Sequence, residues 1–327
     1  MAILQELTED VRGLKDSSLI TWVHGPSGFG KTAIAGSLAE ILTKEGRFAA
    51  SFFFRPEEHQ RLDKIFITSI AFQLAFSIPQ LQPHIAAAVE SNPLIFHQSF
   101  ETQMEKLVIG PTVCSDVGLQ RGIIIDGIDS YPGQAVQRRI LDIIASAAPR
   151  LAGRIKFLIF SRMERHIWRV FDIPAHKSII KTIDMKTHPG LNDDIRIFLR
   201  DRLREIKEME NFQSPLFPPW QEAELIELVV SRSAGNFIFS QMLLEHLDNL
   251  GDIPNGGSSG ADIESILADC FNQRGMAVDS SKGYGMRQTY PQMPYQVDHY
   301  GQSTDIIAVK ETTTSISRDR ELEALKR

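Results

Sequence analysis

The stretch that decides the fold of this 327-residue chain lies near its amino end and reads Gly25-Pro26-Ser27-Gly28-Phe29-Gly30-Lys31-Thr32. It matches the pattern G-x-x-x-x-G-K-[ST] at every fixed position. Residues 19–24 before it are apolar and β-branched and predict a buried strand, whereas residues 31–44 carry a helical pattern. A strand, a glycine-rich loop and a helix in this order predict a loop that binds phosphate through its backbone N–H groups.

Each part of this loop has a chemical reason to bind phosphate. Gly25, Gly28 and Gly30 permit backbone conformations that a Cβ atom would obstruct, so that successive N–H groups can point at phosphate oxygens. The helix that starts near Lys31 adds the positive end of its dipole. We expect Lys31 to reach the β- and γ-phosphates and the Thr32 hydroxyl to ligate Mg²⁺. The loop therefore predicts ATP or GTP as the ligand and Mg²⁺ as the cofactor.

A second signal lies 94 residues beyond the loop, where an apolar run ends in Asp126. A carboxylate at the end of such a strand shares the sheet edge that carries the loop, and it can hold Mg²⁺ through water. Asp129 is a candidate to orient or activate an attacking water, or else a residue that caps a turn. Arg162, after another predicted strand, is a candidate sensor of the γ-phosphate, or else a surface arginine at a strand end.

Apolar runs alternate with helical patterns over the first part of the chain. This alternation predicts an α/β fold, a P-loop NTPase with a parallel sheet covered by helices on both faces. Strands are expected at residues 19–24, 48–54, 122–126, 155–160 and 178–183. Helices are expected at residues 31–44, 62–78, 79–90, 98–109 and 134–147, and after the last strand at 193–210, 219–233 and 236–250.

The same patterns divide the chain into four segments. Residues 1–18 are predicted to be an amphipathic helix and linker, with apolar residues at positions 4, 7, 11 and 14. Residues 19–186 are predicted to form the NTPase core, and residues 187–252 a small helical subdomain. Residues 253–327 begin with a Gly/Ser-rich linker and are rich in polar residues, so we expect this tail to be mostly disordered.

Composition limits the classes of partner. The chain has 35 Lys and Arg against 41 Asp and Glu, a net charge of −6, which does not suit a protein that coats nucleic acid. Its two cysteines, Cys114 and Cys270, form neither a disulfide framework nor a zinc signature. No apolar run approaches the roughly 20 residues of a membrane helix. We therefore expect a reducing setting, no nucleic-acid partner and no membrane span.

Several stretches, taken in order, resemble the NACHT and nephrocystin-type NTPase domains of fungal STAND proteins. The resemblance implies a cytoplasmic, signalling ATPase or GTPase that switches between closed and open states, forms homo-oligomers on activation, and acts in fungal non-self recognition or cell death. The resemblance does not identify an effector or sensor partner. It covers roughly residues 15–250 and is carried by the loop at 25–32, Ala49 to Phe54, Phe72 to Ala75, Ile125 to Asp129, Phe160 to Glu164 and Ser233 to Phe239.

Two positions depart from the pattern of that family. Ser130 stands where the family usually has Glu, and Met163 stands where proline is common. The first departure bears on hydrolysis but not on nucleotide binding, which rests on residues 25–32 and Asp126. Three functions therefore stay open: a slow switch NTPase, a nucleotide-binding interaction module with little or no hydrolysis, and a small-molecule kinase.

Overall fold

The computed structural model describes residues 2–14, 18–54, 62–209, 219–242 and 244. The predicted linker and tail at 253–327 lie outside the described residues, as does the end of the helix predicted at 236–250.

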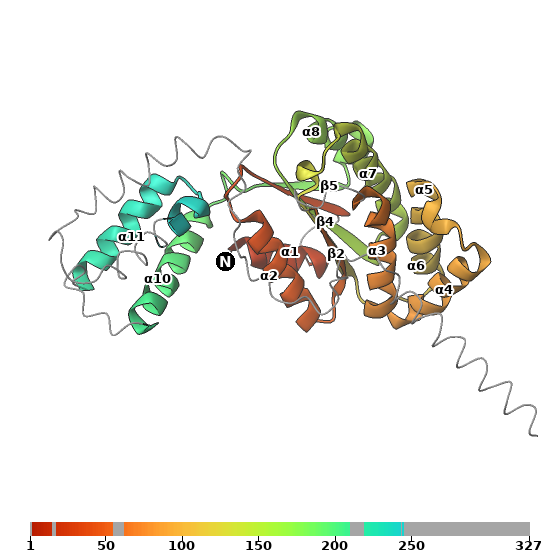
Figure 1. The fold of residues 1–327 in the computed structure, drawn as a ribbon, viewed down its shortest axis with the longest axis horizontal. Coiled ribbons are helices and arrows are strands. Elements are labelled where there is room, and N and C mark those ends of the chain that lie inside the picture. Colours follow the sequence, from red (N-terminus) through yellow and green to blue (C-terminus); the bar gives the residue numbers. More distant parts are fainter. Residues whose placement is uncertain (1, 15–17, 55–61, 210–218, 243, 245–327) are drawn as a thin grey trace, which may run out of the picture. The chain divides into compact units, whose positions relative to one another are not determined.

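A five-stranded parallel sheet forms the centre of the core, in the order β2-β3-β4-β1-β5. Figure 1 shows this sheet with helices around it. Its strands pair in parallel throughout, with Ile20 opposite both Phe157 and Ile180. Each strand is a short run of apolar or β-branched residues, and β1, β3 and β4 are almost wholly buried because they lie inside the sheet. The strands are β1 (Ile20–His24), β2 (Phe48–Phe53), β3 (Arg121–Asp126), β4 (Ile155–Ser161) and β5 (Ile180–Asp184).

Helices cover both faces of this sheet, as predicted. Gly122 lies on the face that α1 and α2 cover, because a Cβ atom there would lie 2.8 Å from Leu42 of α2 and 3.4 Å from Val11 of α1. Ile123 and Ile125 alternate to the other face and belong to the large core that α3, α4, α7 and α8 complete. These helices are α1 (Ala2–Val11), α2 (Lys31–Lys44), α3 (Leu62–Ser77), α4 (Gln82–Ser91), α7 (Gln134–Ala147) and α8 (Arg165–Phe171).

The helices after the sheet have a core of their own. α10 (Leu191–Met209) and α11 (Pro219–Ser233) are followed by helical residues at 237–242. Their apolar faces meet in a cluster that includes Ile195, Val229 and Phe239. Three helices were expected in this part of the chain, and the described residues contain helix in each of the three places.

Several elements differ from the predicted ones. The first helix ends at Val11 rather than at residue 18, since Gly13 has a φ of +73° and Leu14 is 68% exposed. The helix predicted at 98–109 continues to Cys114 through a π-helical stretch. The residues predicted as one helix at 79–90 form a 3₁₀ turn followed by α4. The short helices after β4 were not predicted. These pieces are α5 (Phe100–Gln103), the π-helix Met104–Ile109, α6 (Gly110–Cys114), the 3₁₀ turn Pro79–Leu81, α8 and α9 (Pro174–Lys177).

Among the described helices, none alone has the length and apolar composition of a membrane span. The helices Ile65–Ser77 and Pro79–Ser91, which are bent by 115° relative to each other, reach that length and composition only when taken together.

Candidate functional site

The predicted phosphate loop joins the end of β1 to the start of α2. Because β1 lies between β4 and β5, the loop leaves the sheet at an interior position of its carboxyl edge. Asp126 ends β3 and Ser161 ends β4, so both reach the same edge. The parallel order of the strands thus brings together the segments that sequence patterns selected separately.

The loop backbone has the conformation that its glycines permit. Gly28 has a φ of +86° and Gly30 a φ of +76°, in the left-handed region that residues with a Cβ atom rarely adopt. α2 begins directly after Gly30. The helix therefore presents its first N–H groups at the end of the loop, where they favour an anion.

Lys31 lies over the loop. Its ammonium Nζ donates hydrogen bonds of 2.8 Å to the carbonyl oxygens of Gly25 and Pro26. Burial lowers the pKa of this ammonium, while the nearby carboxylates of Asp129 and Asp126 raise it and Arg162 lowers it further. The Lys31 ammonium thus lies near two carboxylates and one guanidinium, at the loop where a polyphosphate would bind.

Thr32 and Asp126 lie together, as the magnesium prediction requires. The Thr32 hydroxyl donates a 2.7 Å hydrogen bond to Asp126 Oδ2 across 94 positions of sequence. Asp126 is only 5% exposed, and this burial raises the pKa of its carboxyl group to about 6, against the opposing effect of the Thr32 hydrogen bond. Two oxygen ligands of the kind that Mg²⁺ prefers therefore share one position.

Asp129 and Arg162 form an ion pair beside this position. Arg162 Nε donates to Asp129 Oδ2 at 2.6 Å, and the Asp129 side chain is 5% exposed whereas that of Arg162 is 46% exposed. This contact raises the pKa of the guanidinium further above its already high value. Ser130 follows Asp129 in the 3₁₀ turn Ile128–Ser130. The structure thus brings the two candidate catalytic residues together, with Arg162 as the more exposed partner.

Sequence reasoning missed two residues behind Asp129. Gln137, 3% exposed in the first turn of α7, donates through Nε2 to the carbonyl oxygens of Tyr131 at 2.5 Å and Asp129 at 3.4 Å. His166 Nε2 of α8 hydrogen-bonds to Gln137 Oε1. These contacts join the turn that carries Asp129 to both helices. The sequence shows only a glutamine in the first turn of the helix predicted at 134–147, and its burial is visible only in the structure.

His24, the last residue of β1, was also missed as a neighbour of the site. It is 5% exposed, and its Nδ1 lies 3.8 Å from Asp184 Oδ1 at the end of β5. Burial lowers the pKa of this imidazole, and the Lys31 charge lowers it further, against the Asp184 carboxylate. A neutral imidazole next to the phosphate loop contributes packing rather than charge at neutral pH.

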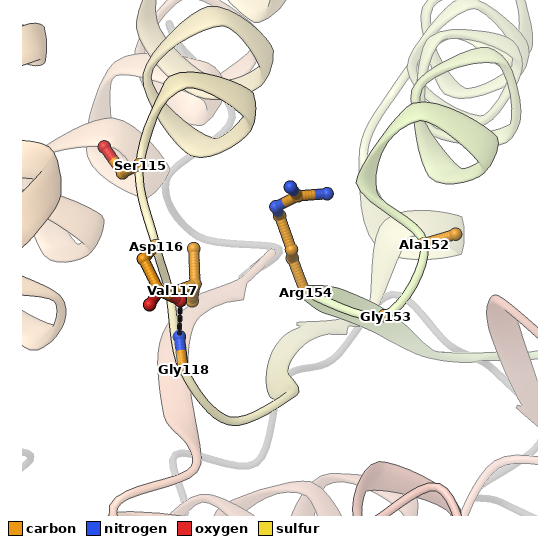
Figure 2. A pocket seen from close by; sticks show the side chains of 7 residues that line it. All are labelled: Ser115, Asp116, Val117, Gly118, Ala152, Gly153 and Arg154. Atoms are coloured by element: carbon orange, nitrogen blue, oxygen red, sulfur yellow. Dashed lines mark hydrogen bonds between the residues drawn. The ribbon is translucent and has the colours of Figure 1, made fainter.

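A cavity of about 490 Å³ lies elsewhere on the core. Loops that precede β3 and β4 line it, so it opens at the amino edge of the sheet, opposite the phosphate loop. Figure 2 shows the Arg154 side chain extending between the two loops, with Asp116 bonded to the Gly118 N–H at 2.9 Å. None of the candidate site residues lines this cavity, which is formed by Ser115, Asp116, Val117, Gly118, Ala152, Gly153 and Arg154.

One family model matches the part of the chain that carries the site. The family model described as Nephrocystin 3, N-terminal, matches residues 4–162, a little under half of the chain. This range includes the loop, Asp126, Asp129 and Arg162. A search of the curated proteins found no relative.

The similarity to solved structures is weak. C. elegans PCH-2 is 12% identical with a TM-score of 0.39, and the match covers 84% of this chain and 67% of that one. The Aeropyrum pernix ORC1 protein, solved in complex with DNA, is 15% identical with a TM-score of 0.43, covering 85% and 65%. This chain thus spans less than two thirds of the ORC1 chain. Similarities at this level carry no functional inference.

The class of protein follows from the chain's own features. A parallel five-stranded sheet with β4 inserted between β1 and β3, helices on both faces, and G-x-x-x-x-G-K-T at the end of β1 define a P-loop NTPase fold.

Proposed function

We propose that the chain binds a Mg²⁺–nucleoside triphosphate, ATP or GTP, at the loop formed by residues 25–32. The observation that carries this proposal is the contact between Thr32 Oγ1 and Asp126 Oδ2 at the end of the loop. Thr32 and Asp126 would hold Mg²⁺, which neutralises phosphate charge when bound. No group of three or more His, Cys, Asp or Glu side chains is gathered for a metal within the described residues, so phosphate oxygens and water would complete the coordination.

Hydrolysis, in this proposal, is slow. Lys31 and Arg162 stabilise charge on the phosphates, and Asp129 is the remaining candidate to orient water. The alternative, a nucleotide-binding interaction module with little or no hydrolysis, is favoured by one specific observation. The Asp129 carboxylate is buried and already bonded to Arg162, and the next position is Ser130, which is too weak a base near neutral pH.

At the level of biology, we propose that the chain is a NACHT or nephrocystin-type domain of the STAND class. It would act in the cytoplasm as a signalling switch in fungal non-self recognition or cell death, and it would form homo-oligomers on activation. The match to the nephrocystin family model over residues 4–162 supports this proposal.

Equilibrium binding of ATP and GTP with Mg²⁺ tests the proposed site. Lys31→Ala should weaken binding at least tenfold, because charge-assisted contacts to phosphate are lost. Lys44→Ala, at the other end of the same helix, is the matched control and should bind like the parent. Equal affinities in all three proteins would refute the loop assignment. Multiple-turnover phosphate release on the same samples then separates the NTPase from the binding module.

A further inference from the structure

A turn that precedes the helix at 237–242 contacts the phosphate loop directly. The backbone N–H of Phe237 donates a 2.8 Å hydrogen bond to the carbonyl oxygen of Gly28. Phe237 is the first residue of its helix, so this N–H has no partner within the helix itself. The helical segment therefore uses one of its free donors to hold the loop.

The side chains around this hydrogen bond fit closely. A Cβ atom on Gly28 would lie 2.4 Å from Asn236 Oδ1, and one on Gly30 would lie 3.4 Å from the Phe237 ring. The fit is equally close from the side of the turn, where a Cβ atom on Gly235 would lie 2.8 Å from the ring of Phe29 in the loop. Phe29 is 6% exposed. Gly28 is thus needed for its positive φ and also because the turn leaves no room for a side chain.

Asn236 fixes the position of the donor. Its Oδ1 accepts hydrogen bonds from the N–H groups of Ile238 at 2.9 Å and Phe239 at 3.4 Å, which is the arrangement of a helix N-cap. The capped first turn holds the Phe237 N–H in one direction. The donor is therefore presented by a formed helix end rather than by an unsupported loop.

We propose that the Phe237 N–H is a positioning contact for phosphate binding, an inference that rests on the proposed nucleotide site. In a planar trans peptide, the carbonyl oxygen and the following N–H point to opposite sides. When Phe237 holds the Gly28 oxygen towards the turn, the N–H of Phe29 points away from it, as a donor for bound phosphate. The helical segment thereby sets the conformation of the loop before nucleotide binds.

A pair of variants at one position tests this contact. Phe237→Pro removes the N–H and the ring, and proline is well tolerated at the first position of a helix. Phe237→Ala removes the ring but keeps the N–H. The proline variant should bind non-hydrolysable ATP or GTP analogues about three- to tenfold more weakly than the alanine variant, as expected for one hydrogen bond. Amide hydrogen exchange in the peptide covering residues 25–32 should also be faster in the proline variant.

The outcomes separate this inference from the proposed function. Equal affinity and equal exchange in the two variants would overturn the positioning role. A parent protein that binds neither nucleotide would refute the proposed function, and the exchange comparison would still decide whether Phe237 holds the loop. If the proline variant does not fold, Asn236→Ala and Asn236→Ser replace the pair, since serine keeps a capping oxygen and alanine does not. Exchange should then be faster in the alanine variant, and equal exchange would overturn the inference.

Discussion

At Asp126, burial and a hydrogen bond act on one carboxyl group in opposite directions. Burial is the larger effect and raises its pKa from an ordinary value of 3.8 to about 6. The folded protein therefore binds more protons than the unfolded chain between about pH 4 and pH 6. The contribution of this group to stability is full below pH 4 and is lost as the pH rises through 6.

Binding of the Mg²⁺–nucleotide should show the opposite pH dependence at the same group. A metal ligand must be deprotonated, so affinity should fall as the pH is lowered through 6. With the pKa of Asp126 at about 6, the expected loss at pH 5 relative to pH 7.5 is about tenfold. Titration of binding against pH measures this. Asp126→Asn should keep only the pH dependence of the nucleotide itself, and an identical profile in both proteins would remove Asp126 from the metal site.

We expect Ser130 to limit the rate at which bound nucleotide is hydrolysed. General-base assistance is worth about 10²–10⁴ in rate. Ser130→Glu should raise single-turnover hydrolysis at least about tenfold, a cautious fraction of that range. Ser130→Gln, of similar size but not basic, should leave the rate unchanged. If the Glu variant is no faster, repeating the measurement in an Asp129→Asn background distinguishes a misdirected side chain from an Asp129 that already suffices.

Among the structural elements, the turn after β3 places Asp129 and depends on Gly127. Gly127 has a φ of +75°, and a Cβ atom there would lie 2.8 Å from the backbone oxygen of Phe54. Gly46, after α2, has a φ of +66° and nothing within 4 Å. Both substitutions by alanine carry the cost of the left-handed conformation, about 1–2 kcal/mol. Gly127→Ala adds a clash with backbone, worth about 1–3 kcal/mol more.

Chemical denaturation of the two alanine variants measures the difference. Gly127→Ala should lower the free energy of unfolding by more than Gly46→Ala, and the excess reports the close approach of Phe54 alone. Equal losses would show that the backbone at Phe54 can move aside.

For the molecule as a whole, local pattern predicted the five strands and the longer helices, but not their order in space. The bounds of α2 and α7 agree with prediction because each begins next to a glycine and carries a clear helical period. The insertion of β4 between β1 and β3 depends on the pairing of β4 with β1, whose partners are more than a hundred residues apart, and no short pattern encodes it. The strand-end motifs nevertheless predicted Thr32 and Asp126 as a pair, since parallel strands share a carboxyl edge.

The residues that were missed act through tertiary contacts. Gln137 reaches the Asp129 turn only because α7 packs beside it, and Phe237 reaches Gly28 only because residues 235–238 fold onto the loop. Neither carries a chemical signature of its own. The ion pair between Asp129 and Arg162 likewise required the neighbouring positions of β3 and β4 in the sheet.

An ion pair with a buried carboxylate joins α1, the first helix, to β5, the last strand. Lys181 of β5 donates to both carboxylate oxygens of Asp10 at 2.8 and 2.9 Å, and to Glu6 at 2.8 Å. The Asp10 side chain is 0% exposed, and the Thr21 hydroxyl also donates to its Oδ2, at 3.3 Å. The bonds to Asp10 span 171 positions of sequence, so contacts between α1 and the last strand hold α1 against the sheet.

Lys181→Met should therefore destabilise the whole core, because it leaves the Asp10 carboxylate buried without its cation. Removing one partner of a buried pair costs about 3–5 kcal/mol, and the 20% exposure of Lys181 places the expected loss near the lower figure. Lys177→Met is the matched control, since its pair with Asp172 is exposed and worth under about 1 kcal/mol. Thermal unfolding compares the two, and Asp10→Leu added to Lys181→Met should recover part of the loss, since no charge then remains buried. Equal melting temperatures for the two single variants would contradict the role of Lys181.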